Sequence, residues 1–169
     1  MIEIPIQQLQ RDGESEFHFT GSQKDLGLGR IEFPLRDLEI YLRLHDADHG
    51  YYLAGELYGI AKLECHRCLT QLPYSLDLKL QTLIVLDDSD DFDGQDEVIH
   101  IDASDQTLDL TGFIHDMILL DLPVKILCRE GCQGLCAQCG TNLNKSTCDC
   151  HTEVIDPRWE KLKELNFEE

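Results

Sequence analysis

The chain has 169 residues, of which 42% are hydrophobic and 28% charged, so it is long and apolar enough to fold around one buried core rather than remain disordered. Its formal net charge of −19 makes direct binding to the phosphates of nucleic acid unfavourable. The sequence shows neither an apolar run of membrane-spanning length nor the basic and apolar regions of an export signal, and we therefore expect a cytoplasmic protein.

The N-terminal half carries the apolar alternation that is typical of β-strands. Leucine and isoleucine alternate with polar residues over 38–45, a turn follows at 48–50, and residues 51–60 continue as a second strand, which predicts a hairpin. A third alternation, over 76–86, pairs most simply with the segment that ends at Cys65. The expectation is a mainly antiparallel β meander that curls into a barrel or half-barrel.

The next segment, residues 87–97, is strongly acidic and is expected to form a loop or linker. Between residues 87 and 121 there are twelve acidic residues and no lysine or arginine. A basic protein partner is the physically simplest binder of this segment, and a solvated loop that serves solubility is the alternative. The candidate partner-binding residues are Asp87, Asp88, Asp90, Asp91, Asp93, Asp96 and Glu97.

A short strand and one core helix are expected after the acidic segment. Residues 98–101 favour the strand, and apolar side chains then recur at helical spacing between Asp109, which offers an N-cap, and Pro123, which ends the pattern. The core helix is therefore predicted at about residues 109–121. Its apolar stripe is interpreted as a face that packs on the core.

These elements predict an α+β fold with two parts. Residues 1–121 are expected to form a β-rich domain that includes the acidic loop and the core helix. Residues 122–169 form a cysteine-rich segment, and Pro157 marks the start of a short terminal helix.

Eight cysteines in a reducing compartment are better explained as metal ligands than as disulfides. Cys136 and Cys139 form a Cys-x2-Cys turn that presents two sulfurs to one metal, and Gly140 suits a position that needs a positive φ. Cys148 and Cys150 are too close in sequence for a comfortable disulfide but can bind one metal together. These four cysteines are predicted to hold one structural zinc ion.

The remaining four cysteines predict a second zinc site. Cys65 and Cys68 lie between predicted strands, and Cys128 and Cys132 follow the core helix. Closing the chain between the two pairs costs about 3.6 kcal/mol, far less than the roughly 10–16 kcal/mol of structural zinc binding. Two other partitions stay open: Cys132 and Cys136 could exchange roles, or the two Cys-x2-Cys pairs could share one metal.

Other uses of the cysteines fit the spacing less well. An iron–sulfur cluster also takes four thiolates, but the run of cysteines ending in Cys-Pro is missing. A thioredoxin-like redox pair would lie between a strand and a helix, and catalytic zinc needs an open ligand position. His66 and His151 are interpreted as polar neighbours of the cysteines. No nucleophile–base pair or phosphate-binding loop can be picked out, so we do not expect an enzyme.

Several short motifs occur together in the C-terminal third. They are Leu122-Pro123, Leu127-Cys128, the run Cys132-x-Gly134-Leu135-Cys136-x2-Cys139-Gly140-x-Asn142-Leu143-Asn144, Cys148-x-Cys150 and Asp156-Pro157-Arg158, with Cys65-x-Arg67-Cys68 upstream. This combination resembles the YceD-like family, the large ribosomal RNA subunit accumulation proteins of bacteria and plastids. The resemblance implies a role in ribosome biogenesis, in the bacterial cytoplasm or a plastid stroma, that supports accumulation of the large-subunit (23S) ribosomal RNA without a known reaction.

The leading hypothesis is a biogenesis factor that carries about two structural zinc ions per chain and acts through protein contacts. Its expected partner is a basic ribosomal protein or another assembly factor. One alternative is a thiol-based redox or zinc-responsive switch. Another is direct RNA binding through the less acidic C-terminal segment, which contains Lys125, Arg129, Lys145, Arg158, Lys161 and Lys163.

Overall fold

A computed structural model of the protein describes residues 1–9, 13–47, 50–86, 98–102 and 105–150. The chain divides into two compact units: Met1–Glu64 with Gln71–Ile126, and Cys65–Thr70 with the residues from Leu127 onward. The acidic segment and the predicted terminal helix lie outside the described residues. Among the residues described, no helix is long and apolar enough to cross a membrane.

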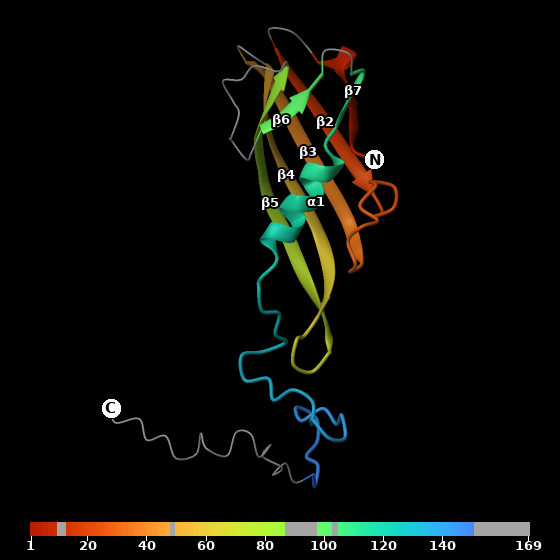
Figure 1. Ribbon diagram of the computed structural model, residues 1–169, viewed down its shortest axis with the longest axis vertical. Helices are drawn as coiled ribbons and strands as arrows, with labels where there is room; N and C mark the ends of the chain where they lie inside the picture. Colours follow the sequence, from red (N-terminus) through yellow and green to blue (C-terminus); the bar gives the residue numbers. More distant parts are fainter. Residues whose placement is uncertain (10–12, 48–49, 87–97, 103–104, 151–169) are drawn as a thin grey trace, which may run out of the picture. The chain divides into compact units, whose positions relative to one another are not determined.

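The first unit is built on a five-stranded sheet with the order β2-β3-β4-β5-β6 (Figure 1). The strands are β2 (Glu14–Gly21), β3 (Leu35–Ala47), β4 (Gly50–Glu64), β5 (Gln71–Leu86) and β6 (Val98–Ile101). Strands β2 to β5 pair in antiparallel fashion, which confirms the predicted meander. Strand β6 pairs with β5 in parallel. Residue alternation carries no information on strand direction, so this pairing was not predicted.

A two-stranded ribbon fastens the N-terminus to the start of the helix. It consists of β1 (Glu3–Pro5) and β7 (Thr107–Asp109), which pair in antiparallel fashion, and a single 3-10 turn follows β1 at Ile6–Gln8. The Ile2 amide donates to Thr111 Oγ1 at 3.0 Å, and the Leu110 amide donates to the Ile2 carbonyl at 2.9 Å. This long-range pairing was not expected from the sequence.

The helix α1 (Thr111–Asp121) lies against one face of the sheet (Figure 1). Its N-cap is Leu110, which makes no side-chain capping bond, and not the predicted Asp109. Asp109 instead lies just before the cap, where its Oδ1 accepts a hydrogen bond from the Thr111 amide at 2.8 Å. Ile114 and Ile118 are fully buried. At the other end the Tyr74 hydroxyl of β5 contacts the Asp121 carboxylate at 3.1 Å. The helix is thus tied to the β1–β7 ribbon at its start and to β5 at its end.

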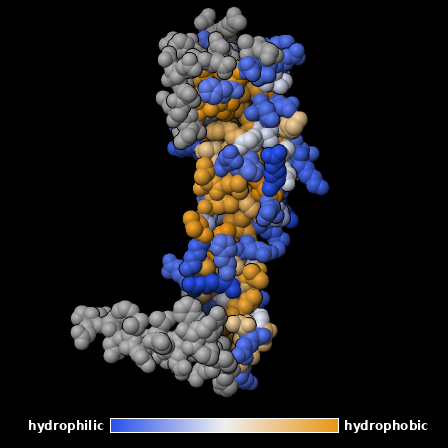
Figure 2. Space-filling model, viewed as in Figure 1, coloured by the Kyte–Doolittle hydropathy of each residue, from blue (hydrophilic) through white to orange (hydrophobic). Residues whose placement is uncertain are grey.

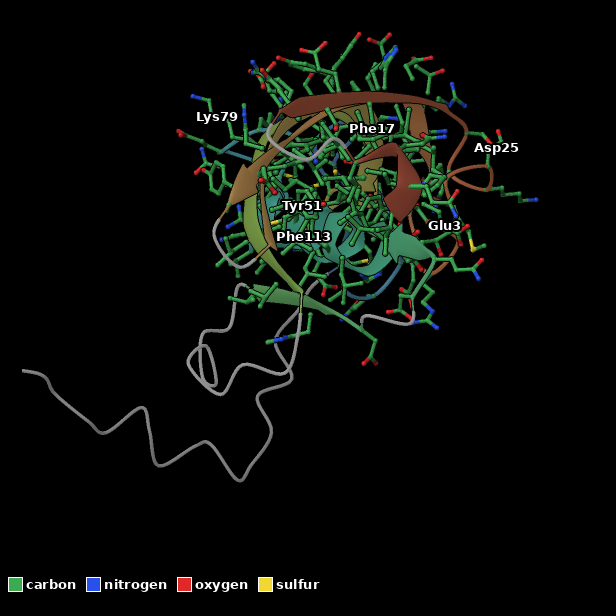
Figure 3. The ribbon with its side chains drawn as sticks, turned by 90° about the horizontal axis from the view of Figure 1, so that it is seen from above. Glu3, Phe17, Asp25, Tyr51, Lys79 and Phe113 are labelled. Atoms are coloured by element: carbon green, nitrogen blue, oxygen red, sulfur yellow. The ribbon has the colours of Figure 1, made fainter. Side chains whose placement is uncertain are left out.

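The core of the first unit lies between the sheet and α1. Alternate residues of β3 point into it: Leu38, Ile40, Leu42 and Leu44 are between 0% and 1% exposed. Seen along the strands, Phe17 and Tyr51 point to the interior while Lys79 points away from it (Figure 3). Apolar residues also gather on the surface that carries α1 (Figure 2). Within the described residues, the predicted class of a mostly antiparallel sheet with one helix is confirmed.

Candidate metal centres

Two turns of the second unit share the sequence Cys-x2-Cys-x-Thr, at Cys65–Thr70 and at residues 136–141. In each turn the first cysteine's amide donates to the threonine carbonyl, at 3.0 Å and 2.8 Å. The residue after the second cysteine donates to the first cysteine's carbonyl at 2.9 Å in both turns. That residue has a positive φ, 55° at Leu69 and 73° at Gly140. The two turns therefore have the same structure, and the positive φ predicted for Gly140 is confirmed.

The first group of cysteines joins one turn to the segment after Leu127. Cys65 and Cys68 come together with Cys128 and Cys132, and all four sulfurs lie within 4.8 Å of one another. Three of these cysteines are buried and Cys128 is exposed. The group connects residues that are far apart in sequence, so a metal here would clamp the Cys65–Thr70 turn to the later segment.

The second group is local in sequence and more open to solvent. Cys136, Cys139, Cys148 and Cys150 place their sulfurs within 4.8 Å of one another. Cys136 is buried, Cys139 is exposed, and the other two are half-buried. The structure thus assembles the two quartets that the spacing favoured, rather than either of the two alternative partitions. Ligation of metal by these quartets stays a prediction.

The sulfur positions of the first group suit a tetrahedral metal. With metal–sulfur bonds of about 2.3 Å, neighbouring sulfurs of a tetrahedron lie about 3.8 Å apart. The sulfurs of Cys65 and Cys132 are 3.8 Å apart, and those of Cys68 and Cys128 are 3.6 Å apart. All eight cysteines are free thiols. Each quartet can therefore surround one ion with four sulfur donors and leave no position open.

The thiols of the first group differ in acidity. Burial opposes the thiolate of Cys65, but backbone hydrogen bonds, that of Arg67 foremost, outweigh burial and lower the pKa of Cys65 to about 6. The hydrogen bond with Cys68, together with burial, raises the pKa of Cys128 to about 12. Without a cation, four crowded thiols cannot all ionise, because neighbouring thiolates repel one another. A divalent ion removes this conflict.

The second group likewise contains a thiol with a lowered pKa and a thiol with a raised pKa. Hydrogen bonds with Thr141 lower the pKa of Cys139 to about 6, and the hydroxyl Oγ1 lies 3.1 Å from the Cys139 sulfur. The hydrogen bond with Cys139 and burial raise the pKa of Cys150 to about 12. The same relation links Cys68 to Thr70 at 3.2 Å in the first turn. In both groups a threonine hydroxyl is placed to support one thiolate.

Asn144 connects the two groups. It lies in the chain between Cys139 and Cys148, yet its Nδ2 donates to the sulfur of Cys132, a member of the first group, at 3.3 Å. Its Oδ1 accepts from the Gln133 amide at 3.0 Å and from Arg129 Nη2 at 2.8 Å. The loop of the second quartet therefore supplies a hydrogen bond to a ligand of the first.

Arg67 braces the first turn against the later segment. Its Nη1 donates to the Cys132 carbonyl at 2.8 Å, and its own carbonyl accepts from the Leu135 amide at 3.1 Å. Gly134 has a φ of 79°, and a Cβ added there would lie 3.1 Å from the Arg67 carbonyl oxygen. The close approach of these backbones explains why glycine stands at this position.

The sequence prediction named the eight cysteines but missed the residues that support them. Asn144, Arg67 and the two threonines were not expected to be part of a site, although the threonine two positions after each Cys-x2-Cys pair was a visible signal. Among the described residues, His66 belongs to neither group of potential ligands. His151 and the acidic candidates over 87–97 lie outside the described residues.

The sequence profile of a family described as "Large ribosomal RNA subunit accumulation protein YceD" matches residues 53–166, about two thirds of the chain. The matched region contains all eight cysteines together with most of β4, all of β5 and α1. It therefore covers both candidate metal centres and the central part of the β-rich unit.

Individual relatives come from bacteria and plants. An uncharacterized protein of Mycobacterium tuberculosis is 36% identical over 130 residues, which cover 76% of this chain and 61% of that protein. An uncharacterized protein of Bacillus subtilis, YlbN, is 28% identical over 116 residues, 68% of this chain and 63% of that protein.

A plant relative carries a functional name. The large ribosomal RNA subunit accumulation protein YCED homolog 1, chloroplastic, of Zea mays is 39% identical over 66 residues, which cover 38% of this chain and 22% of that protein. No solved structure matches the chain. The chain thus spans less than two thirds of the length of the relatives it matches.

Proposed function

Because this chain belongs to the YceD family of large ribosomal RNA subunit accumulation proteins, we propose that it supports accumulation of the large-subunit (23S) ribosomal RNA as a non-enzymatic biogenesis factor. The family match over residues 53–166 carries this proposal. Relatives named for this accumulation occur in chloroplasts, and other relatives are bacterial. This distribution supports a site of action in the bacterial cytoplasm or an equivalent plastid compartment.

The two cysteine quartets are proposed to hold one zinc ion each. Four thiolates at tetrahedral separations are the donor set that structural zinc prefers. The ion of the first quartet would join the Cys65–Thr70 turn to the segment that carries Cys128 and Cys132. Cys68 and Cys128 are 60 positions apart in the chain. In this role zinc stabilises the second unit and performs no chemistry.

A non-enzymatic role agrees with the closed form of both quartets. Catalytic zinc usually keeps a fourth position open for water or substrate, whereas four thiolates fill the tetrahedron. Among the described residues the perturbed thiols of Cys65, Cys128, Cys139 and Cys150 all belong to the two quartets. We therefore assign these perturbed thiols to metal binding rather than to nucleophilic catalysis.

The proposed partner is a basic ribosomal protein or another basic assembly factor. The net charge of −19 favours a cationic partner over the phosphates of RNA. The acidic segment over 87–97 supplies the strongest local charge and remains the candidate contact. Binding of this kind is expected to weaken with salt, because the charges are screened within about 8 Å at physiological ionic strength.

Measuring large-subunit against small-subunit ribosomal RNA tests the accumulation function. Cells that lack the gene are expected to show a lowered ratio, which the wild-type chain restores.

A variant with the seven acidic residues of 87–97 changed to asparagine or glutamine tests the partner contact, with immobilised chain used to capture ribosomal proteins. Unchanged capture of every partner by this variant would exclude the acidic segment, and an unchanged RNA ratio in the deletion would exclude the function itself.

A thiol or zinc-responsive switch is the second candidate. The observation in its favour is the exposure of Cys128 and Cys139 and the partial exposure of Cys148 and Cys150. Such a switch predicts that at least one cysteine pair reacts with an alkylating agent in the folded protein. Closed structural centres predict protection of all eight cysteines until a chelator is added.

A further inference from the structure

The outer face of the sheet presents a cluster of aromatic rings to solvent. His18 of β2 stacks on Tyr41 of β3 with ring centroids 4.2 Å apart and planes 8° from parallel. Tyr58 of β4 meets Tyr41 edge-on, with centroids 6.4 Å apart. Tyr41 and Tyr58 are 42% and 38% exposed. These rings face away from the core, so packing of the first unit does not explain them.

Each of the two tyrosines is bonded to a glutamate of its own strand. The Tyr41 hydroxyl donates to Glu39 Oε2 at 2.9 Å, and the Tyr58 hydroxyl donates to Glu56 Oε2 at 2.7 Å. Across the sheet Tyr41 faces Glu56 and Glu39 faces Tyr58. The four residues thus alternate as a checkerboard, which we call the tyrosine–glutamate patch.

The hydrogen bonds determine what the tyrosine–glutamate patch can bind. Both tyrosine hydroxyls use their protons on carboxylates, and these bonds raise the pKa of Tyr41 and Tyr58. The hydroxyl oxygens therefore offer only lone pairs to a partner, and the glutamates offer carboxylate oxygens. Ligand groups that supply hydrogen-bond donors and positive charge complement these acceptors.

A shallow hollow adjoins the tyrosine–glutamate patch. It has a volume of about 550 Å³ and is lined by Glu16, Phe17, His18, Tyr41, Leu42, Arg43 and Glu56. The β4 residue opposite Arg43 is Ala54, which has only a small side chain. The lining residues thus include two glutamates, one arginine and the stacked pair His18 and Tyr41.

We propose that the tyrosine–glutamate patch and the adjoining hollow bind arginine side chains of a basic protein segment. A guanidinium group is planar and always charged, stacks on aromatic rings, and donates paired hydrogen bonds to carboxylates. A nucleic acid could stack on the rings, but its phosphates would lie beside Glu16, Glu39 and Glu56. This inference rests on the protein partner of the proposed function and adds a contact surface outside residues 87–97.

The first experiment titrates the full chain with synthetic peptides and follows backbone amide signals by NMR. The probes are a peptide of alternating arginine and glycine and the same peptide with citrulline, which keeps the shape of arginine but lacks its charge. The arginine peptide is expected to shift signals of β3 and β4, and to bind about tenfold more tightly than the citrulline peptide. Equal binding, or shifts confined to other strands, would overturn the proposal.

Matched variants separate the tyrosine–glutamate patch from general attraction to an acidic protein. Glu56→Gln still accepts the Tyr58 hydrogen bond but lacks the charge, and is expected to weaken arginine-peptide binding about three- to tenfold. Glu32→Gln removes the same charge at an exposed position outside the patch and is expected to change binding little. Equal losses in the two variants, with both folds intact by NMR, would contradict the proposal.

Two further outcomes separate arginine binding at the patch from RNA binding and from the accumulation function. A single-stranded RNA oligonucleotide that shifts the same β3 and β4 signals more strongly than the arginine peptide would make the surface a nucleic-acid site and overturn the proposal. If the peptide does not bind but the chain still restores the ribosomal RNA ratio, the patch fails and the proposed function stands. If the peptide binds but deletion of the gene leaves the ribosomal RNA ratio unchanged, the patch stands and the proposed function fails.

Discussion

Replacing Asn144 with alanine tests the link between the two metal centres. The change removes the Nδ2 donor 3.3 Å from the Cys132 sulfur, and the Oδ1 acceptor for Gln133 and Arg129. A hydrogen bond to a charged acceptor contributes about 1.5–3 kcal/mol, and loss of such a supporting partner commonly lowers metal affinity about 10–100-fold. The two ranges agree, because 1.4 kcal/mol corresponds to about tenfold.

The assay adds a chelator to the metal-loaded chain and maps by mass spectrometry when each cysteine becomes open to alkylation. In the alanine variant the quartet containing Cys132 is expected to lose protection at about 10–100-fold lower chelator concentration. The quartet containing Cys136 should change less. Lys145→Ala, in the same loop, serves as the control. An unaffected Cys132 quartet, or equal loss of protection in both quartets, would show that Asn144 does not support Cys132 in particular.

Asn144→Asp adds a second control, because it removes the Nδ2 donor to the Cys132 sulfur but keeps the Oδ1 acceptor for Arg129 and Gln133. The carboxylate can still accept from Arg129 and Gln133, but it places an oxygen where a donor faced the Cys132 thiolate. Its effect on the Cys132 quartet should be at least as large as that of alanine. A near-normal aspartate variant would show that Asn144 acts only by holding its loop.

Three further predictions concern stability and pH. Leu69→Gly should stabilise the second unit by about 1 kcal/mol in chelator titrations, and Gly140→Ala should destabilise it by a similar amount, since both positions have positive φ. A destabilised Leu69→Gly variant and a stabilised Gly140→Ala variant would contradict the shared turn structure. Ile114→Ala should lower the free energy of unfolding by about 2–5 kcal/mol in urea, because the side chain is fully buried; a loss below 1 kcal/mol would mean that α1 packs loosely. As the pH is lowered, zinc affinity should fall about tenfold per pH unit for each thiol that must lose a proton to bind the metal. The fall should be steeper below pH 6, where Cys65 and Cys139 take up protons as well. An affinity that stays constant from pH 8 to 5 would contradict these pKa shifts.

The sign of the pH effect follows from the direction of the shifts. The pKa of Cys65 is lowered to about 6 from 9.0, so its thiolate stabilises the metal-free fold fully above pH 9, and this contribution is lost as the pH falls to 6. The pKa of Cys128 is raised to about 12, so its thiol contributes below pH 9 and is lost as the pH rises to 12. Metal binding must displace the Cys128 proton and therefore releases it at neutral pH.

The elements that local patterns specify were predicted from the sequence. Alternation over 38–45 and 76–86 reports which side chains face the core, and this gave the β3, β4 and β5 meander. The spacing of apolar residues before Pro123 gave α1. The partition of the cysteines could be favoured because a Cys-x2-Cys turn and a Cys-x-Cys pair each present two sulfurs locally, which leaves few ways to complete two quartets.

Features that depend on distant contacts were missed. Nothing in residues 98–101 reveals that β6 runs parallel to β5, and nothing in residues 3–5 points to pairing with β7. Asn144 supports Cys132 only because the loop after Cys139 folds back, and that path is not encoded in spacing. The tyrosine–glutamate patch likewise depends on the β3–β4 register, since a shift by one residue would turn these side chains into the core.

Native mass spectrometry of protein purified without oxidation measures whether the two cysteine quartets hold metal. We expect a chain that carries about two zinc ions, and a strong chelator should release them and expose all eight cysteines to alkylation. A metal-free chain with reduced cysteines that keeps its second unit folded in chelator would contradict this expectation. Iron with labile sulfide in place of zinc would contradict it equally.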